Sequence, residues 1–201
     1  MELILLVLTI AFVAFSFQRR DERRRIALLG SHLGQYQIEK LMATLTEGYM
    51  RALGEADPAR QAQIWSTLTT AESAVCEQFN RLVAAFARVD AADARVSKLA
   101  LSIFYTQKLM PDATFDLRKV LSVHAHGICN AANNAQGRNP KDKAFTVLAE
   151  LFLMQHTCHW FCKSKLVASS RLLVRHQTPY AKVLESVAPE TRQAYCALVA
   201  R

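Results

Sequence analysis

The chain opens with an uninterrupted apolar segment. Residues 3–17, LILLVLTIAFVAFSF, contain no charged side chain. At about 1.5 Å per residue, a helix of this length spans about 22 Å, whereas the hydrocarbon core of a bilayer is about 30 Å thick. Flanking residues, and long arginine side chains that reach the headgroups, extend such a helix. We therefore expect residues 1–18 to form a single transmembrane anchor.

The charges around this segment predict that it stays uncleaved. A secretory signal has positive charges before its apolar region and a small-residue cleavage site after it. Here Glu2 is the only charged side chain before the segment, and QRRDERRR follows without an A-x-A-like site. Positive residues remain cytoplasmic, so at the inner (plasma) membrane we expect the N-terminus outside and everything after Arg19 in the cytoplasm. The alternative is an apolar helix that packs in an oligomer or lies on the membrane surface.

Residues 19–34 form a basic juxtamembrane segment in this interpretation. Its arginines set the topology and are expected to contact anionic headgroups, at about 1 kcal/mol each near the surface. They are Arg19, Arg20, Arg23, Arg24 and Arg25. Gly30 and Gly34 weaken the helix that continues from the anchor, so a bend is expected there.

Helical periodicity continues through residues 35–201, which we take as one domain. The clearest pattern is a heptad repeat of about three heptads, which favours packing inside a bundle over a long coiled coil. Leu68, Val75, Leu82 and Val89 recur every seven residues, with Phe79 and Phe86 between them.

The other helices are predicted from apolar spacing and from their end signals. One apolar face runs from Ile38 to Tyr49 and stops at EADPAR, where Asp57 can cap the next helix and Pro58 suits its first turn. Further helices are expected over about 92–110, 114–135 and 140–175, with short ones beginning at 179 and 189. In the first of these, the inward positions are Val96, Leu99 and Ile103. No strand pattern appears, so we expect an all-α fold: the anchor and then a cytoplasmic bundle of about five to six helices.

The positive charge lies in the C-terminal part of the chain. The net charge is +8, and residues 118–201, with twelve basic and four acidic residues, hold all of it. A basic face attracts anionic lipid, nucleic acid or an acidic protein, although it can also be an ordinary solvated surface. The residues proposed for partner contact are Lys163, Lys165, Arg171 and Arg175.

Two histidines and two cysteines fall within HTCHWFCK, residues 156–163. At about 100° per residue, Cys158 and Cys162 lie in the middle of the apolar helix face, where cysteine packs as a small hydrophobe. His156 and His159 are expected at its flank. A metal site on Cys158, His159 and Cys162 is the alternative, but zinc needs about four ligands.

The nearest source of a fourth ligand is HAHGIC, residues 124–129. On a helix, His124 aligns with core positions, whereas His126 and Cys129 share the opposite side, so the donors scatter. We therefore expect no metal or other cofactor. A disulfide is also not expected, because the cytoplasm is reducing and the chain has an odd number of cysteines, five.

Catalytic motifs are absent from the sequence. There is no P-loop, no G-x-S-x-G and no Glu-x-x-His pair of a di-iron bundle. The spacing of Arg171 and His176 is similar to the Arg-to-His spacing of helical ribonucleases of the HEPN type, in which such a pair could orient a phosphate and move a proton. In this chain a leucine, Leu172, follows the arginine where those proteins have a polar residue.

These features favour a binding protein over an enzyme. We expect a membrane-anchored scaffold or regulator whose cytoplasmic bundle recruits a protein partner. The alternatives are a metal-binding sensor on the Cys/His cluster and the helical ribonuclease. Nucleic acid is not the favoured partner, and the sequence leaves open whether the chain forms an oligomer.

Overall fold

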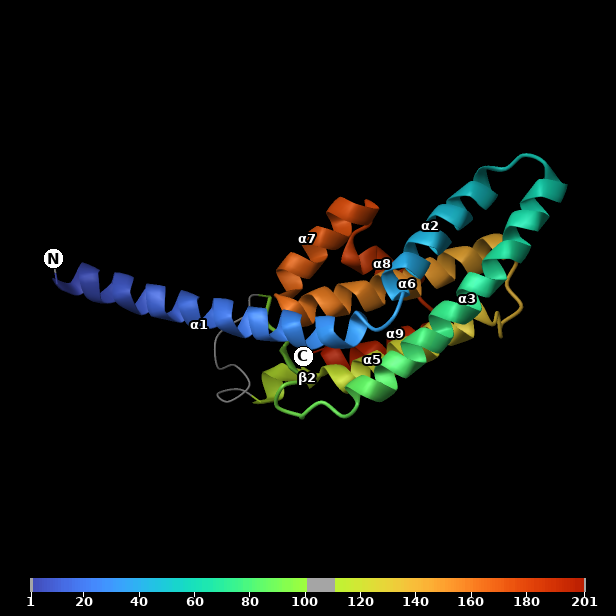
Figure 1. The fold of residues 1–201 in the computed structure, drawn as a ribbon. Helices are drawn as coiled ribbons and strands as arrows, with labels where there is room; N and C mark the ends of the chain where they lie inside the picture. The colour runs from blue at the N-terminus through green and yellow to red at the C-terminus, as the bar shows by residue number, and fades with distance from the viewer. Residues whose placement is uncertain (1, 101–110, 201) are drawn as a thin grey trace.

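The computed structural model describes residues 2–100 and 111–200, and this part of the chain is helical apart from one small ribbon (Figure 1). Its eight α-helices are α1 (Glu2–Leu33), α2 (Ile38–Gly54), α3 (Pro58–Phe86), α5 (Leu117–Ala132), α6 (Pro140–Cys162), α7 (Lys165–His176), α8 (Tyr180–Ser186) and α9 (Pro189–Val199). The strands β1 (Arg95–Ser97) and β2 (Thr114–Asp116) pair antiparallel, and a 3₁₀ turn, Pro111–Ala113, precedes β2. The all-helical prediction is thus confirmed at the level of fold class.

The core is built around α6. This helix contacts α1, α2, α5, α7 and α8, and it buries side chains on most of its circumference. The heptad seam predicted on α3 is confirmed over Leu68, Val75, Phe79, Leu82 and Phe86, which are all buried, whereas Val89 lies beyond the end of α3 and is half-buried. Gly48 on α2 allows close packing there, because a Cβ at this position would lie 2.3 Å from Leu68 Cδ2.

The predicted helix over 92–110 is wrong at its start. Val96 is the centre of β1, where it pairs with Phe115 of β2 and is buried. Contacts distant in sequence hold this strand: Trp160 Nε1 donates to the Ser97 carbonyl at 2.8 Å, and Arg25 Nη1 donates to the Arg95 carbonyl at 3.0 Å. Leu99 also lies outside any helix and is half-buried, and the remainder of that prediction, residues 101–110 with Ile103, lies outside the described residues.

The long helix predicted over 140–175 is two helices. Its start is confirmed, because Asn139 accepts a hydrogen bond from the Asp142 amide at 2.9 Å and Pro140 follows the cap. The chain leaves helical geometry at Lys163, and Ser164 caps α7 by accepting from the Val167 amide at 3.3 Å. Serine is a preferred N-cap residue, and this local cap outweighs the apolar periodicity that predicts one continuous helix.

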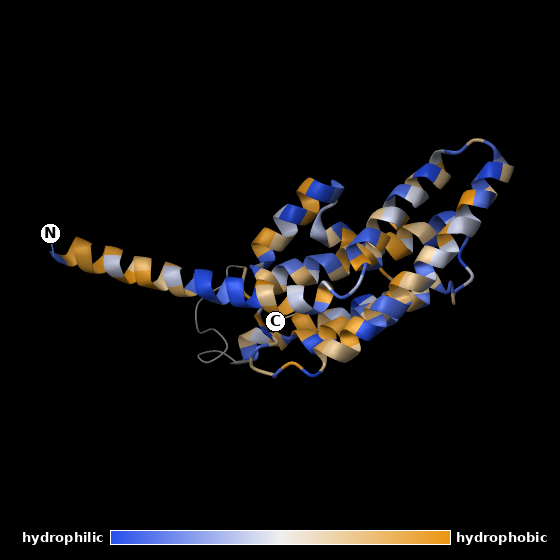
Figure 2. Ribbon diagram, in the orientation of Figure 1, coloured by the Kyte–Doolittle hydropathy of each residue, from blue (hydrophilic) through white to orange (hydrophobic). Residues whose placement is uncertain are grey.

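Helix α1 has two halves with different surroundings. Its first half is apolar and exposed, and it projects away from the other helices (Figure 2). Its second half packs on α6 and α3, burying Leu29. Among the described residues it is the one helix long and apolar enough to cross a membrane. The helix continues through Gly30 and ends at Leu33, and the chain turns at Gly34 before α2 begins at Ile38.

Candidate functional site

The cysteines and histidines of HTCHWFCK point to different sides of α6. Cys158 is buried in the apolar face, as predicted. This burial raises the pKa of its thiol to about 12. His156 is also buried, although the sequence predicts it at the flank of the apolar face. Its Nε2 lies 3.1 Å from Ser169 Oγ, and its ring stacks on Tyr180. The helices α7 and α8, which the sequence pattern could not place, cover this side.

The alternative metal ligands are not assembled. Within residues 2–100 and 111–200, no group of three His, Cys, Asp or Glu side chains could hold a metal ion, so Cys158, His159 and Cys162 do not converge. His124 is a core residue, as predicted, and its Nε2 lies 2.8 Å from Thr157 Oγ1.

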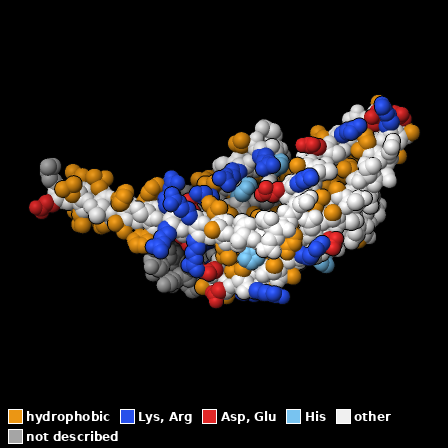
Figure 3. Space-filling model, viewed as in Figure 1, with side chains coloured by type: hydrophobic (Ala, Val, Ile, Leu, Met, Phe, Trp, Pro, Cys, Tyr) orange, Lys and Arg blue, Asp and Glu red, His pale blue; other side chains and the backbone are white. Residues whose placement is uncertain are grey.

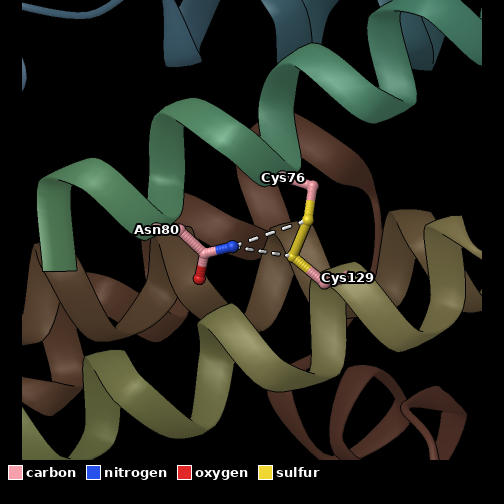
Figure 4. The surroundings of a disulfide bond; sticks show 3 residues. All are labelled: Cys76, Asn80 and Cys129. Atoms are coloured by element: carbon pink, nitrogen blue, oxygen red, sulfur yellow. Dashed lines mark hydrogen bonds between the residues drawn. A yellow bond between two sulfur atoms is a disulfide. The ribbon is translucent and has the colours of Figure 1, made fainter. Parts of the chain in front are cut away.

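A disulfide joins Cys76 on α3 to Cys129 on α5 (Figure 4). The two Cα atoms are 5.2 Å apart, and the side-chain amide of Asn80 donates to Cys129 Sγ at 3.3 Å. The expectation of no disulfide is therefore wrong for this pair. The sequence placed Cys129 away from the core of its own helix but could not show that α3 covers it.

The proposed ribonuclease pair is not brought together. His176 Nε2 lies 2.8 Å from Gln155 Oε1, and its ring stacks on Phe152 with the centroids 3.8 Å apart. Arg171 lies five residues earlier on α7, about 140° away around the helix, and its charge acts on His159 and Cys162 instead. No shared phosphate position follows from this arrangement.

Of the four basic residues proposed for partner contact, two are used inside the fold. Lys163 forms an ion pair with Glu22 of α1, and Lys165 Nζ lies over the rings of Trp160 and Tyr180, 5.0 and 5.3 Å from their centroids. Arg171 and Arg175 are exposed on α7, and within the described part of the chain neither forms an ion pair. They remain the basic residues available to a partner.

The juxtamembrane arginines divide in the same way. Arg25 points into the domain and also pairs with Asp21, while Arg24 pairs with Asp93 at 2.8 Å. Arg25 thus makes its contacts within the domain, whereas the side chain of Arg24 is 69% exposed beside Asp93 and stays a candidate for headgroup contact. Arg19, Arg20 and Arg23 are exposed and stay candidates for headgroup contact.

Two cavities lie along one face of α6. The larger, of about 460 Å³, is lined by α2, α6, α7, α8 and the turn between α7 and α8, and the smaller, of about 190 Å³, by α1, α2 and α6. The two share no lining residue. Their α6 lining follows one helical stripe, formed by Phe145, Leu148, Phe152, Gln155, His159 and Cys162. Between them His176 of α7 stacks on Phe152 and lies 2.8 Å from Gln155. Figure 3 shows lysine, arginine and histidine side chains near α7, together with acidic ones, and further basic side chains along α1. These two cavities are the candidate functional site.

No protein-family model, curated protein or solved structure matches the chain. Function must therefore be inferred from the geometry of the molecule.

The buried histidines predict a loss of stability in acid. Burial lowers the pKa of His124 and of His156 to about 3, whereas the unfolded chain protonates both near 6.5. Stability from these neutral rings is therefore present above pH 6.5 and is lost as the pH falls. Burial also lowers the pKa values of His159 and His176, which add to this loss, whereas buried Glu150, whose pKa burial raises to about 7, acts in the opposite direction. Urea titrations at pH 7 and pH 5 should show a net loss of about 1–2 kcal/mol.

Two variants isolate the histidine contribution. His156→Phe keeps the stacking on Tyr180 and removes one titrating ring, so the acid loss should become clearly smaller. His126→Gln changes an exposed histidine and should leave the loss unchanged. An equal loss in His156→Phe and the unmodified chain would show that the buried ring does not cause it.

Proposed function

We propose that this protein is a membrane-anchored interaction module, in which residues 1–18 cross the bilayer and the helical domain recruits or regulates a protein partner at its surface. The supporting observation is that the first half of α1 is apolar and exposed, whereas its second half packs against the domain. Side chains such as Leu3 and Phe12 are 73% and 71% exposed. Burying a side chain of this size contributes roughly 2 kcal/mol, so a bilayer is the favoured surrounding for the apolar half.

The anchor and the domain form one mechanical unit in this proposal. Polar contacts fix α1 to the domain within about 12 Å of its apolar end at Phe17: the Glu22–Lys163 ion pair and the Arg25 contact with β1. The domain is then held at the membrane surface by a continuous helix rather than by a flexible linker. Such tethering raises the effective concentration of the domain for any partner at the same surface.

The orientation in this proposal places the domain in the cytoplasm. The arginines that follow the apolar segment favour this side, and Glu2 on the other side does not oppose it. The Cys76–Cys129 disulfide opposes this side, because disulfides persist in oxidising compartments. No arrangement of residues described above favours the metal sensor or the ribonuclease.

The test is whether the location of a partner follows the anchor. Partners would be cross-linked in cells that express the full chain or a variant with Val7→Arg and Ile10→Arg, which should release the domain from the membrane. A partner recruited by this protein should be membrane-bound with the full chain and soluble with the variant. If the distribution of every cross-linked protein is the same in both cells, the chain does not act by recruitment.

A further inference from the structure

The smaller cavity, where α1 and α2 meet α6 (Figure 1), is lined by several sulfur-bearing side chains. Its volume is about 190 Å³, and its α6 wall includes Met154, Cys158 and Cys162. These residues stand four apart on one helix, so they follow a single stripe that turns by about 40° at each step. Met42 of α2 also lines the cavity. Two helices thus bring two thiols and two thioethers to one small space.

Two sulfur atoms of α6 already have the spacing of ligands to one metal ion. Cys158 Sγ lies 3.8 Å from Met154 Sδ. At about 2.3 Å per metal–sulfur bond, two ligands are about 3.8 Å apart in tetrahedral coordination and about 4.0 Å apart in trigonal coordination. Cys162, one turn further along, is half-buried and has a free thiol. Because residues i and i+4 have Cβ atoms about 5–6 Å apart, rotation about χ1 can bring both thiols onto one ion.

The chemistry of these donors selects the kind of ion. Zinc takes about four ligands from thiolate, imidazole and carboxylate groups, and the described residues hold no group of three such side chains. Thiolates and thioethers are instead the ligands that Cu(I) prefers, and Cu(I) accepts trigonal coordination. The thioether of Met154 is therefore the third donor that the zinc alternative lacks.

The charges near the cavity suit the complex that would form. Binding of Cu⁺ by two thiols releases both protons and leaves a complex of charge −1. Burial raises the pKa of the Cys162 thiol to about 11, and the charges of Arg171, Arg25 and Lys163 act against this rise. Arg25 and Lys163 have acidic partners, whereas Arg171 is exposed and has no ion pair in the described part of the chain. Glu39 at the rim is exposed, so solvent screens its opposing charge. Arg171 is thus the cation placed to stabilise an anionic complex at Cys162.

We propose that this cavity binds one Cu(I) ion through the thiolates of Cys158 and Cys162 and the thioether of Met154. The ion has a route to these ligands from the α1 side. Ile26 at the edge of the cavity is 45% exposed, and a Cβ added at Gly30 would meet no other part of the structure within 4 Å. This inference goes beyond the proposed function, because the site needs neither a bilayer nor a protein partner.

The experiment measures copper binding to the full chain in detergent, under argon and with ascorbate to keep copper as Cu(I). A thiol assay that counts three thiols per chain first verifies that the Cys76–Cys129 disulfide is intact. The probe is the Cu(I) complex of bicinchoninate, whose colour is lost as the protein withdraws copper. We expect transfer of one copper per chain, a sulfur shell at about 2.3 Å in X-ray absorption, and no stoichiometric zinc after incubation with zinc chloride.

Protein variants then locate the ion. Met154→Leu keeps the volume and the apolar packing but removes the sulfur, so it should weaken Cu(I) binding at least about tenfold. Cys162→Ser changes a half-buried position and should weaken binding at least about a hundredfold. The matched control is Cys196→Ser, a free cysteine on α9 outside the cavity, which should bind as the unmodified chain does. The melting temperature without copper verifies that each variant is folded, and Cu(I) should raise it in the unmodified chain and in the control.

Several outcomes would overturn the copper site. They are no withdrawal of copper from bicinchoninate, equal affinity in Cys162→Ser, and unchanged affinity in Met154→Leu. Stoichiometric zinc would contradict the choice of ion, and loss of copper in Cys196→Ser would place the ion elsewhere. If a partner follows the anchor in cells but no copper binds, the copper inference alone fails. If copper binds as expected but no partner follows the anchor, the proposed function alone fails.

Discussion

Replacement of Val7 and Ile10 by arginine is expected to move the protein from the membrane fraction to the soluble fraction. Both side chains lie in the exposed apolar half of α1. An arginine near the centre of a membrane-spanning helix costs about 3 kcal/mol, so two cost about 6 kcal/mol, a shift of roughly ten-thousandfold in the membrane-bound to soluble ratio. Extraction with alkaline carbonate followed by sedimentation measures this ratio.

The fold of the domain should not change in this variant. The first half of α1 makes no contribution to the buried core, whose first member along the chain is Leu29. The melting temperature of the purified variant should therefore match that of the unmodified chain. A control with Val7→Leu and Ile10→Leu keeps the segment apolar and should stay in the membrane. Resistance of the double-arginine protein to carbonate would contradict a spanning anchor and favour an apolar helix packed in an assembly.

The second large effect is expected at Glu72, where a buried carboxylate joins three helices. It is 5% exposed on α3, accepts a hydrogen bond from Tyr49 Oη of α2 at 2.5 Å, and forms an ion pair with Lys143 of α6. Glu72→Ala leaves the buried phenol of Tyr49 and the partly exposed ammonium of Lys143 without their partner. Removing one member of a buried pair costs about 3–5 kcal/mol, and urea titration should show a loss of that order.

A matched control lies on the same helix. Glu77 pairs with Arg81 at 2.7 Å, but both side chains are exposed, and such a surface pair contributes about 0–1 kcal/mol. Glu77→Ala should therefore change the free energy of unfolding little. A similar small loss in both variants would mean that Glu72 is solvated in solution and does not hold α2, α3 and α6 together.

The parts of the fold that sequence predicted are those with a local cause. The heptad on α3 and the caps at Asp57 and Asn139 depend on residues within one or two turns, so spacing alone reveals them. The β1–β2 ribbon depends instead on residues that are distant along the chain. Val96 pairs with Phe115, and Trp160 and Arg25 donate hydrogen bonds to the backbone of β1. A three-residue strand has too few alternations to be distinguished from one helical turn.

The candidate site was predicted only in part for a similar reason. A count of charges located the basic region. It could not show that Lys163 forms an ion pair with Glu22 or that Lys165 lies over aromatic rings. The larger cavity depends on the turn at Ser164, after which α7 runs back over α6, whereas the sequence pattern predicts continuous helix there. Cys76 and Cys129 likewise meet only because α3 packs on α5.

The most direct measurement is proteolysis of membrane vesicles of both orientations that contain the full chain. A membrane-anchored domain on the cytoplasmic side predicts that trypsin degrades residues after Arg19 in inside-out vesicles and leaves them intact in right-side-out vesicles. Degradation in right-side-out vesicles alone would contradict this orientation and place the Cys76–Cys129 pair in the oxidising compartment. Loss of the protein from both kinds of vesicle before protease is added would contradict the anchor itself.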